Sequence, residues 1–202
     1  MGGVNRIRSM PQLPGIIATM SETGKAHIFD LTNSLNAFMT KGSPRAALVT
    51  KPIYSFTGHQ DEGYAIDWNP IITGRLITGD CSGAIRLWNP SQSFNNNNNN
   101  NTNNGGSVSS SSNLSSFSWQ VDNQSLHSHK GSVEDLQWSP SEATVFASCS
   151  SDKSIKIWDI RDKSKAQISI DAHEEDVNVI SWNKSVAYLL ASGCDDGSFK
   201  VK

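Results

Sequence analysis

The sequence has almost no excess of charge and no long apolar run. Its 202 residues carry 17 Lys and Arg against 19 Asp and Glu, a formal net charge of −2, so no global positive field draws the chain to nucleic acid. No apolar stretch approaches the roughly 18 residues that a membrane span needs, and the first ten residues lack a signal-peptide core. We therefore expect neither sequence-specific binding to nucleic acid nor a membrane partner.

Cysteines are few and far apart. Cys81, Cys149 and Cys194 are odd in number and form no Cys-x-x-Cys pair, which argues against a disulfide framework and a zinc site and favours a reducing compartment. His127 and His129 form a pair that no further Cys or His joins at ligand spacing. No phosphate-binding or dinucleotide-binding glycine motif is present. The sequence therefore predicts no metal site and no cofactor.

Apolar and charged residues are also scarce, at 36% and 18%. Much of this deficit is local, because residues 95–104 are nine Asn and one Thr, and residues 105–118 add eight Ser. A polar run of low complexity cannot bury a core. We expect 91–118 to be a disordered, Asn/Ser-rich insertion in a surface loop, and the rest of the chain to be an ordinary folded domain.

That remaining chain repeats itself. Three segments align on a histidine, and in each a tryptophan follows nine positions later: His59 and Trp68, His129 and Trp138, His173 and Trp182. Twenty-nine positions after the histidine come, in order, Trp88, Trp158 and Lys202. A fourth copy without the histidine lies at the start, since Val4 and Phe29 match Val133 and Trp158 in sequence and in spacing. The regular spacing indicates an array of similar units.

Each unit has the pattern of short strands. The first strand alternates, as in VEDLQW, the second is small and apolar, as in FASCS, and the third alternates again, as in IKIW, after a tight turn. A fourth strand fits before each histidine, as in IYSF before Gly58. Four strands per unit of about 44 residues, with Gly-His and Trp-Asp signatures, resemble the WD40 β-propeller. The sequence is therefore identified as all-β.

The resemblance also implies how the chain is organised. WD40 domains usually close a ring of about seven blades, because an open arc leaves sheet edges and apolar faces bare. We expect the whole chain, 1–202, to be a partial propeller with blades at about 1–57, 58–126, 127–170 and a truncated 171–202. A half-propeller that pairs with itself is the alternative to a part of a seven-bladed ring.

Some of the repeated polar residues match the hydrogen-bonded network that holds a WD40 blade together. The network positions of the second, third and fourth units are His59, Thr78 and Trp88; His129, Ser148, Asp152 and Trp158; and His173, Ser192 and Asp196. In the second unit, Ser82 stands at the position of the turn Asp. A catalytic triad would occur once, in a cleft, whereas this set recurs and is incomplete in two units. We expect a structural role and no enzyme.

A second set of residues flanks the first apolar residue of each inner strand, where a propeller builds its recognition face. Alternation along a strand makes the two flanking side chains point the same way, and none of them is Lys or Arg. Carboxylates, amides and one aromatic ring suit a basic peptide, although acidic residues at loop edges are often only solvated. The expected basic-peptide site comprises Asn5, Glu62, Tyr64, Glu134, Asp176 and Asn178.

Several short segments narrow the resemblance. Val4-Asn5-Arg6, Glu62-Gly63-Tyr64 and Val133-Glu134-Asp135 are similar to the histone-binding WD40 proteins of the retinoblastoma-binding class. The stretches GHQDEGYAIDWNP, TGRLITGDC, SVEDLQWSP and IWDIR most closely resemble the glutamate-rich WD-repeat family.

This resemblance implies a ribosome biogenesis factor that acts in large-subunit assembly in the nucleus or nucleolus. It also implies the partners, which are pre-ribosomal particles and basic proteins such as ribosomal proteins and histones. Within the matching positions, Gly3 stands where the relatives tend to be acidic, which weakens the contribution of the first blade. The alternatives are a histone-binding subunit of a chromatin complex and a substrate adaptor of an E3 ligase.

Overall fold

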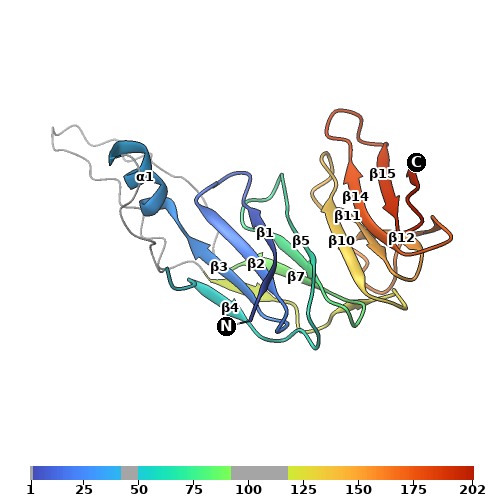
Figure 1. Cartoon of the computed structure of the whole chain (residues 1–202), viewed down its shortest axis with the longest axis horizontal. Coiled ribbons are helices and arrows are strands. Elements are labelled where there is room, and N and C mark those ends of the chain that lie inside the picture. Colours follow the sequence, from blue (N-terminus) through green and yellow to red (C-terminus); the bar gives the residue numbers. More distant parts are fainter. Residues whose placement is uncertain (1, 42–49, 92–117) are drawn as a thin grey trace.

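The computed structural model describes residues 2–41, 50–91 and 118–202. The strands in these ranges form four antiparallel sheets that follow one another along the chain, from the N-terminal sheet beside the helix to the C-terminal sheet (Figure 1). The expected insertion at 91–118 lies outside the described residues except for its two end positions.

The first two sheets come from the N-terminal half of the chain. The first has the order β1 (Val4–Ser9), β2 (Ile16–Ser21), β3 (Ala26–Asp30) and β4 (Tyr54–Phe56). The second has the order β5 (Ala65–Trp68), β6 (Leu76–Gly79), β7 (Ala84–Pro90) and β8 (Trp119–Val121), and β9 (Leu126–His127) also pairs with β7. The outer strand of the second sheet is therefore built in two pieces, one at each end of β7.

The last two sheets repeat the same order. The third contains β10 (Val133–Trp138), β11 (Val145–Ser150), β12 (Ser154–Asp159) and β13 (Ile168–Asp171), and the fourth contains β14 (Val177–Trp182), β15 (Leu190–Cys194) and β16 (Phe199–Val201). Each strand pairs with the next along the chain, as in a propeller blade. The prediction of an all-β chain with about four propeller blades is confirmed, apart from one helix among the described residues.

One helix, α1 (Thr32–Lys41), was not predicted. It lies in the long connection between β3 and β4, where we expected only the strand before Gly58. Asp30 accepts a hydrogen bond from the backbone N–H of Thr32 at 2.9 Å, which satisfies one of the unpaired donors at a helix start. Leu35 and Phe38 are nonetheless exposed, so the helix has no buried apolar face whose pattern reveals it. Within the described ranges, no helix has the length and apolar character that crossing a membrane requires.

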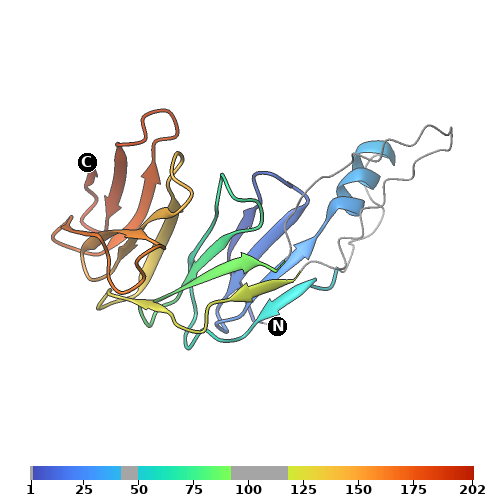
Figure 2. The same cartoon turned by 180° about the vertical axis from the view of Figure 1, so that it is seen from behind.

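The core consists of layers between successive sheets. Met20, Trp88 and Trp119 belong to the cluster that joins the first and second sheets. Ile77, Leu136 and Trp158 belong to the cluster that joins the second and third, and Cys149, Val177 and Ile180 to the cluster that joins the third and fourth. Each sheet thus packs against its neighbours in the chain, as expected for a repeat architecture. Figure 2 shows the same succession of sheets from behind.

Candidate functional site

In the third blade, the four expected network residues lie together. The His129 Nε2 atom lies 2.7 Å from Ser148 Oγ, and its Nδ1 atom lies 2.9 Å from Asp152 Oδ2. The indole N–H of Trp158 donates to the same Ser148 oxygen at 2.8 Å. The network therefore connects the loop before β10 with β11, β12 and the turn between them.

The charged groups of this network have shifted acidities. Burial alone would raise the pKa of Asp152, but hydrogen bonds from Ser154, Lys130 and His129 outweigh it and hold the pKa at about 2. Burial lowers the pKa of His129, against the opposing effect of Asp152. Since Asp152 remains a carboxylate, it accepts the Nδ1–H of the neutral imidazole, and Nε2 then accepts the Ser148 hydroxyl proton.

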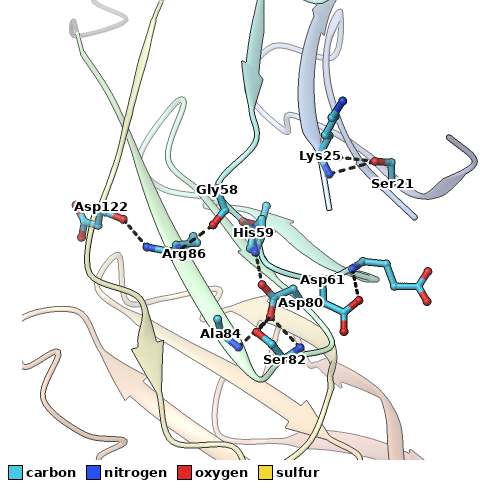
Figure 3. A network of polar contacts seen from close by, with 12 residues as sticks. Ser21, Lys25, Gly58, His59, Asp61, Asp80, Ser82, Ala84, Arg86 and Asp122 are labelled. Carbon is cyan, nitrogen blue, oxygen red and sulfur yellow. Dashed lines mark hydrogen bonds and ion pairs between the residues drawn. The ribbon is translucent and has the colours of Figure 1, made fainter. Parts of the chain in front are cut away.

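The second blade forms the same network with one different residue. The His59 Nε2 atom lies 2.7 Å from Thr78 Oγ1, which also accepts the indole N–H of Trp88 at 2.9 Å. The His59 Nδ1 atom, however, lies 2.8 Å from Asp80 Oδ2 (Figure 3). Ser82 stands at the position of the turn Asp and donates its hydroxyl to Asp80 Oδ1. The expectation that this blade's network is incomplete was wrong, because Asp80 supplies the carboxylate.

The error has a geometric cause. Positions 80 and 82 lie in the same tight turn between β6 and β7, so that a carboxylate at either position reaches the histidine ring. Spacing alone indicated position 82, whereas the carboxylate of this blade stands at position 80. Asp80 was the residue that sequence reasoning missed, and the signal for it was an Asp two residues before the expected one.

The fourth blade contains a partial network. The His173 Nε2 atom lies 2.8 Å from Ser192 Oγ, as in the other blades, while its Nδ1 atom lies 3.2 Å from Ser198 Oγ. Asp196 accepts the backbone N–H of Ser198 at 2.7 Å. Hydrogen bonds from Ser198, with a further one from Cys194, lower the pKa of Asp196 to about 2.

These networks are not accessible catalytic triads. Thr78 and Ser148 are completely buried, and each hydroxyl is shared between a histidine and a tryptophan. A nucleophilic serine needs an exposed Oγ beside a site for the reacting carbonyl. The geometry holds strands in place and leaves no room for a substrate at the hydroxyl.

The expected binding residues lie at equivalent points of the four blades, where each inner strand begins. At each point, a backbone carbonyl accepts a hydrogen bond from an amide in the turn between the second and third strands: Glu22 to Gly3 at 3.1 Å, Cys81 to Glu62 at 2.8 Å, Ser151 to Ser132 at 3.1 Å, and Asp195 to Asp176 at 3.0 Å. We call the six residues Asn5, Glu62, Tyr64, Glu134, Asp176 and Asn178 the acidic rim.

Glu62 is the centre of the rim contacts. Its Oε2 atom accepts hydrogen bonds from Asn5 Nδ2 at 3.2 Å and from the Tyr64 hydroxyl at 3.3 Å. The negative charge of Glu62 is the main cause of the raised pKa of Tyr64. Asn178, by contrast, donates to Asp195 within its own blade. Glu134 and Asp176 are half-buried.

The side chains of the acidic rim do not follow a regular alternation along the inner strands, because three of these strands are irregular. The pairing register shifts between Val4 and Arg6 in β1, and at the matching points of β10 and β14. Asn5, Glu134 and Asn178 are the extra residues of these bulges. A β-bulge re-aims a side chain and often occurs at a functional edge. The expectation of regular alternation was therefore wrong for these three strands.

Comparison with known proteins agrees with this geometry. The family model for the WD domain, G-beta repeat, matches residues 120–159 and 164–201. The chain therefore contains WD40 repeats, arranged as the blades of a propeller.

Relatives of this WD40 protein extend the similarity to most of its length. It is 46% identical over 169 residues to the Dictyostelium discoideum glutamate-rich WD repeat-containing protein 1, covering 84% of this chain and 30% of that protein. It is 38% identical over 187 residues to the Schizosaccharomyces pombe ribosome assembly protein rrb1, covering 89% and 34%. It is 43% identical over 165 residues to the Arabidopsis thaliana protein HEAT STRESS TOLERANT DWD 1, covering 79% and 30%.

These matches confirm the resemblance to the glutamate-rich WD-repeat proteins. The WD40 chain spans about a third of the length of the curated relatives it matches.

A recess of about 460 Å³, which sequence reasoning missed, lies at the other ends of the WD40 inner strands. Asp67, Gln137 and Trp182 are among its lining residues. Asp67 accepts the backbone N–H of Trp138 at 2.8 Å, and Gln137 accepts that of Trp182 at 2.7 Å. The residue before the strand tryptophan thus connects each of these inner strands to the next. The recurrence of a polar residue at this position was the available signal.

Asp67→Asn should make the stability of the WD40 chain less dependent on pH. Burial, with a smaller contribution from the charge of Asp135, raises the pKa of Asp67 to about 7, whereas 3.8 is its ordinary value. Between these values the unfolded chain has lost a proton that the folded chain keeps, so that wild-type stability falls as pH rises. An Asn side chain still accepts the Trp138 N–H without ionising.

The melting temperatures of both proteins, measured from pH 4 to pH 8, test this. The melting temperature of the variant, relative to that of the wild type, should rise up to about pH 7, the pKa of Asp67. Above that pH the difference should level off. A difference in melting temperature that stays constant across this pH range would contradict a carboxyl whose pKa is raised by burial.

Proposed function

We propose that this WD40 protein is a non-catalytic scaffold of ribosome assembly that binds basic protein segments at its acidic rim. The observation that carries the proposal is the Glu62 cluster, in which Asn5 and Tyr64 hold one carboxylate at the rim. Support for the process comes from the S. pombe relative, which is named a ribosome assembly protein. The partners in this proposal are basic ribosomal proteins, pre-ribosomal particles and histones, and its location is the nucleus or nucleolus.

The chemistry of the rim favours Arg and Lys side chains. Glu62, Glu134 and Asp176 are half-buried, and partly desolvated carboxylates attract a cation more strongly than fully hydrated ones. Tyr64 offers a ring on which a guanidinium stacks. The amides of Asn5 and Asn178 are suited to a peptide backbone. Electrostatic attraction would guide the encounter, and docking on these groups would follow.

Reversing two rim charges should weaken the binding of basic peptides. We expect Glu62→Lys combined with Glu134→Lys to reduce affinity for a fluorescein-labelled peptide of alternating Arg, Lys and Gly by about tenfold or more at low salt. The dependence of Kd on salt should become flatter, because fewer attractive charges remain to be screened. Fluorescence anisotropy at several salt concentrations measures both quantities, and far-UV circular dichroism checks the fold.

A matched double variant away from the rim controls for net charge. Glu142 lies in the exposed loop between β10 and β11, and Asp171 is exposed on the outer strand β13. Glu142→Lys with Asp171→Lys changes the net charge equally and should leave most of the affinity intact. Wild-type affinity in the rim variant, or equal losses in both variants, would overturn the rim assignment.

The cellular role is tested by affinity purification of the endogenous protein and identification of its partners by mass. Large-subunit ribosomal proteins and assembly factors are the expected partners. Recovery of chromatin complexes or ligase subunits in their place would reject the role in ribosome assembly and leave the fold and the peptide-binding result unchanged.

A further inference from the structure

The repeated blades provide an internal comparison for the turn beside each histidine. In the second blade, the carboxylate that contacts the His59 Nδ1 atom comes from Asp80, and in the third blade the one that contacts His129 comes from Asp152. By the repeat spacing, these are two different positions of the same turn. A side chain at either position therefore reaches the Nδ1 atom of the blade histidine.

The fourth blade carries metal-binding side chains at both positions at once. Cys194 corresponds to Asp80, and Asp196 corresponds to Asp152. The ligand atoms of His173, Cys194 and Asp196 all lie within 4.8 Å of one another. The sequence predicted no metal site, because these residues are not at a recognisable ligand spacing. The three are brought together only by the folding of β15 and its turn against the histidine loop.

The surroundings orient the histidine for this role. Ser192 Oγ holds the Nε2 atom of His173 at 2.8 Å, which leaves Nδ1 directed toward the turn, as in the other blades. A partner on the remote nitrogen is the usual way in which proteins orient a ligating imidazole. The contact of Nδ1 with Ser198 Oγ, at 3.2 Å, is longer than the His–Asp contacts of the second and third blades.

We propose that His173 Nδ1, Cys194 Sγ and a carboxylate oxygen of Asp196 bind one zinc ion. A thiolate, an imidazole and a carboxylate are all zinc ligands, whereas calcium and magnesium require mostly oxygen ligands. Zinc–ligand distances of about 2.0–2.3 Å place neighbouring ligands about 3.4–3.6 Å apart in a tetrahedron. Asp196 is exposed and Cys194 is half-buried, so rotation of their side chains achieves this contraction.

Binding takes the Cys194 thiol to the thiolate and releases its proton to solvent. The fourth coordination position faces solvent beside the exposed Asp196 and takes a water molecule. The ion connects the histidine to the turn, as the His–Asp hydrogen bond does in the second and third blades. Because zinc binds only the folded site, it should also raise the melting temperature.

Zinc titration of the reduced, chelator-treated chain tests the site. In competition with a chromophoric chelator, the wild type should bind one Zn²⁺, and Co²⁺ should give the near-ultraviolet charge-transfer absorption of a cobalt thiolate. Cys194→Ser and Asp196→Asn should each weaken zinc binding by about tenfold or more, and Cys194→Ser should abolish the cobalt–thiolate absorption. Cys81→Ser, which changes another half-buried cysteine beside a strand-connecting turn, is the matched control and should bind as the wild type does.

Two results would overturn the proposal. One is a folded wild type that binds no zinc, and the other is a Cys194→Ser variant that retains wild-type affinity and the cobalt absorption. If circular dichroism shows that Cys194→Ser does not fold, the Asp196→Asn variant, changed at an exposed position, provides the test. Unchanged zinc affinity in Asp196→Asn would reject the three-ligand site.

Discussion

Trp158→Ala is expected to destabilise the protein by about 3–5 kcal/mol, the usual cost of truncating a large buried aromatic side chain. Trp158 is 1% exposed, and its ring stacks on Phe146 with a centroid separation of 5.8 Å. Its indole N–H also donates to Ser148, so the variant loses a network bond in addition to leaving a cavity between the second and third blades.

Urea denaturation followed by far-UV circular dichroism measures this loss. Trp182→Ala is the comparison, because Trp182 is half-buried and donates its N–H to Ala187 in its own loop. Its loss should be clearly smaller. Trp158→Phe separates the two contributions, since it retains much of the ring volume and removes the donor. An unchanged unfolding midpoint for Trp158→Ala would contradict the placement of this residue in the blade core.

Asp80→Ala is expected to have an effect of similar size, about 3–5 kcal/mol, as for removing one partner of a buried charged contact. The Asp80 side chain is buried and contacts His59, while its other oxygen accepts bonds from Ser82 and from the backbone N–H of Ala84. Its loss leaves several buried donors without an acceptor, which is the costly outcome.

The effect of Asp80→Ala should also depend on pH. Burial opposes the ionised form of Asp80, but hydrogen bonds from His59 and Ser82 outweigh it and hold the pKa below its ordinary value of 3.8. The stabilisation is therefore fully present above about pH 4 and is lost as pH falls through the lowered pKa. Thermal unfolding curves of wild type and variant should converge in that acidic range.

Two further variants test whether the stabilisation by Asp80 depends on its contact with the histidine from this turn. Ser150→Ala changes the equivalent position of the third blade, where Ser150 Oγ accepts only the Asp152 N–H among the described contacts, and should cost about 1 kcal/mol. Asp80→Ser with Ser82→Asp transfers the third blade's arrangement to the second and should recover most of the loss. Equal destabilisation by Asp80→Ala and Ser150→Ala would contradict the network described for the second blade.

Much of the fold follows from the repeat alone. The constant spacing from histidine to the first tryptophan identifies three units, and the matching spacing from Val4 to Phe29 identifies a fourth. Short turns between antiparallel strands then leave little freedom of register. Once the register is set, His129, Ser148 and Trp158 must meet, as they do. Helix α1 was not predicted because its apolar side chains Leu35 and Phe38 are exposed, so they do not form the repeating pattern of a buried helix face.

The sequence by itself thus determined the WD40 repeats and the four blades, because these depend on spacing along the chain. Only the tertiary structure decided which residues contact one another across turns and between blades. Asp80 rather than Ser82 reaches His59, and Asp67 binds a strand 71 positions away. The bulges that present Asn5 and Glu134 likewise appear only in the pairing of strands. These contacts depend on distances between side chains in the folded chain. Spacing along the sequence does not show which of two positions in one turn faces the histidine.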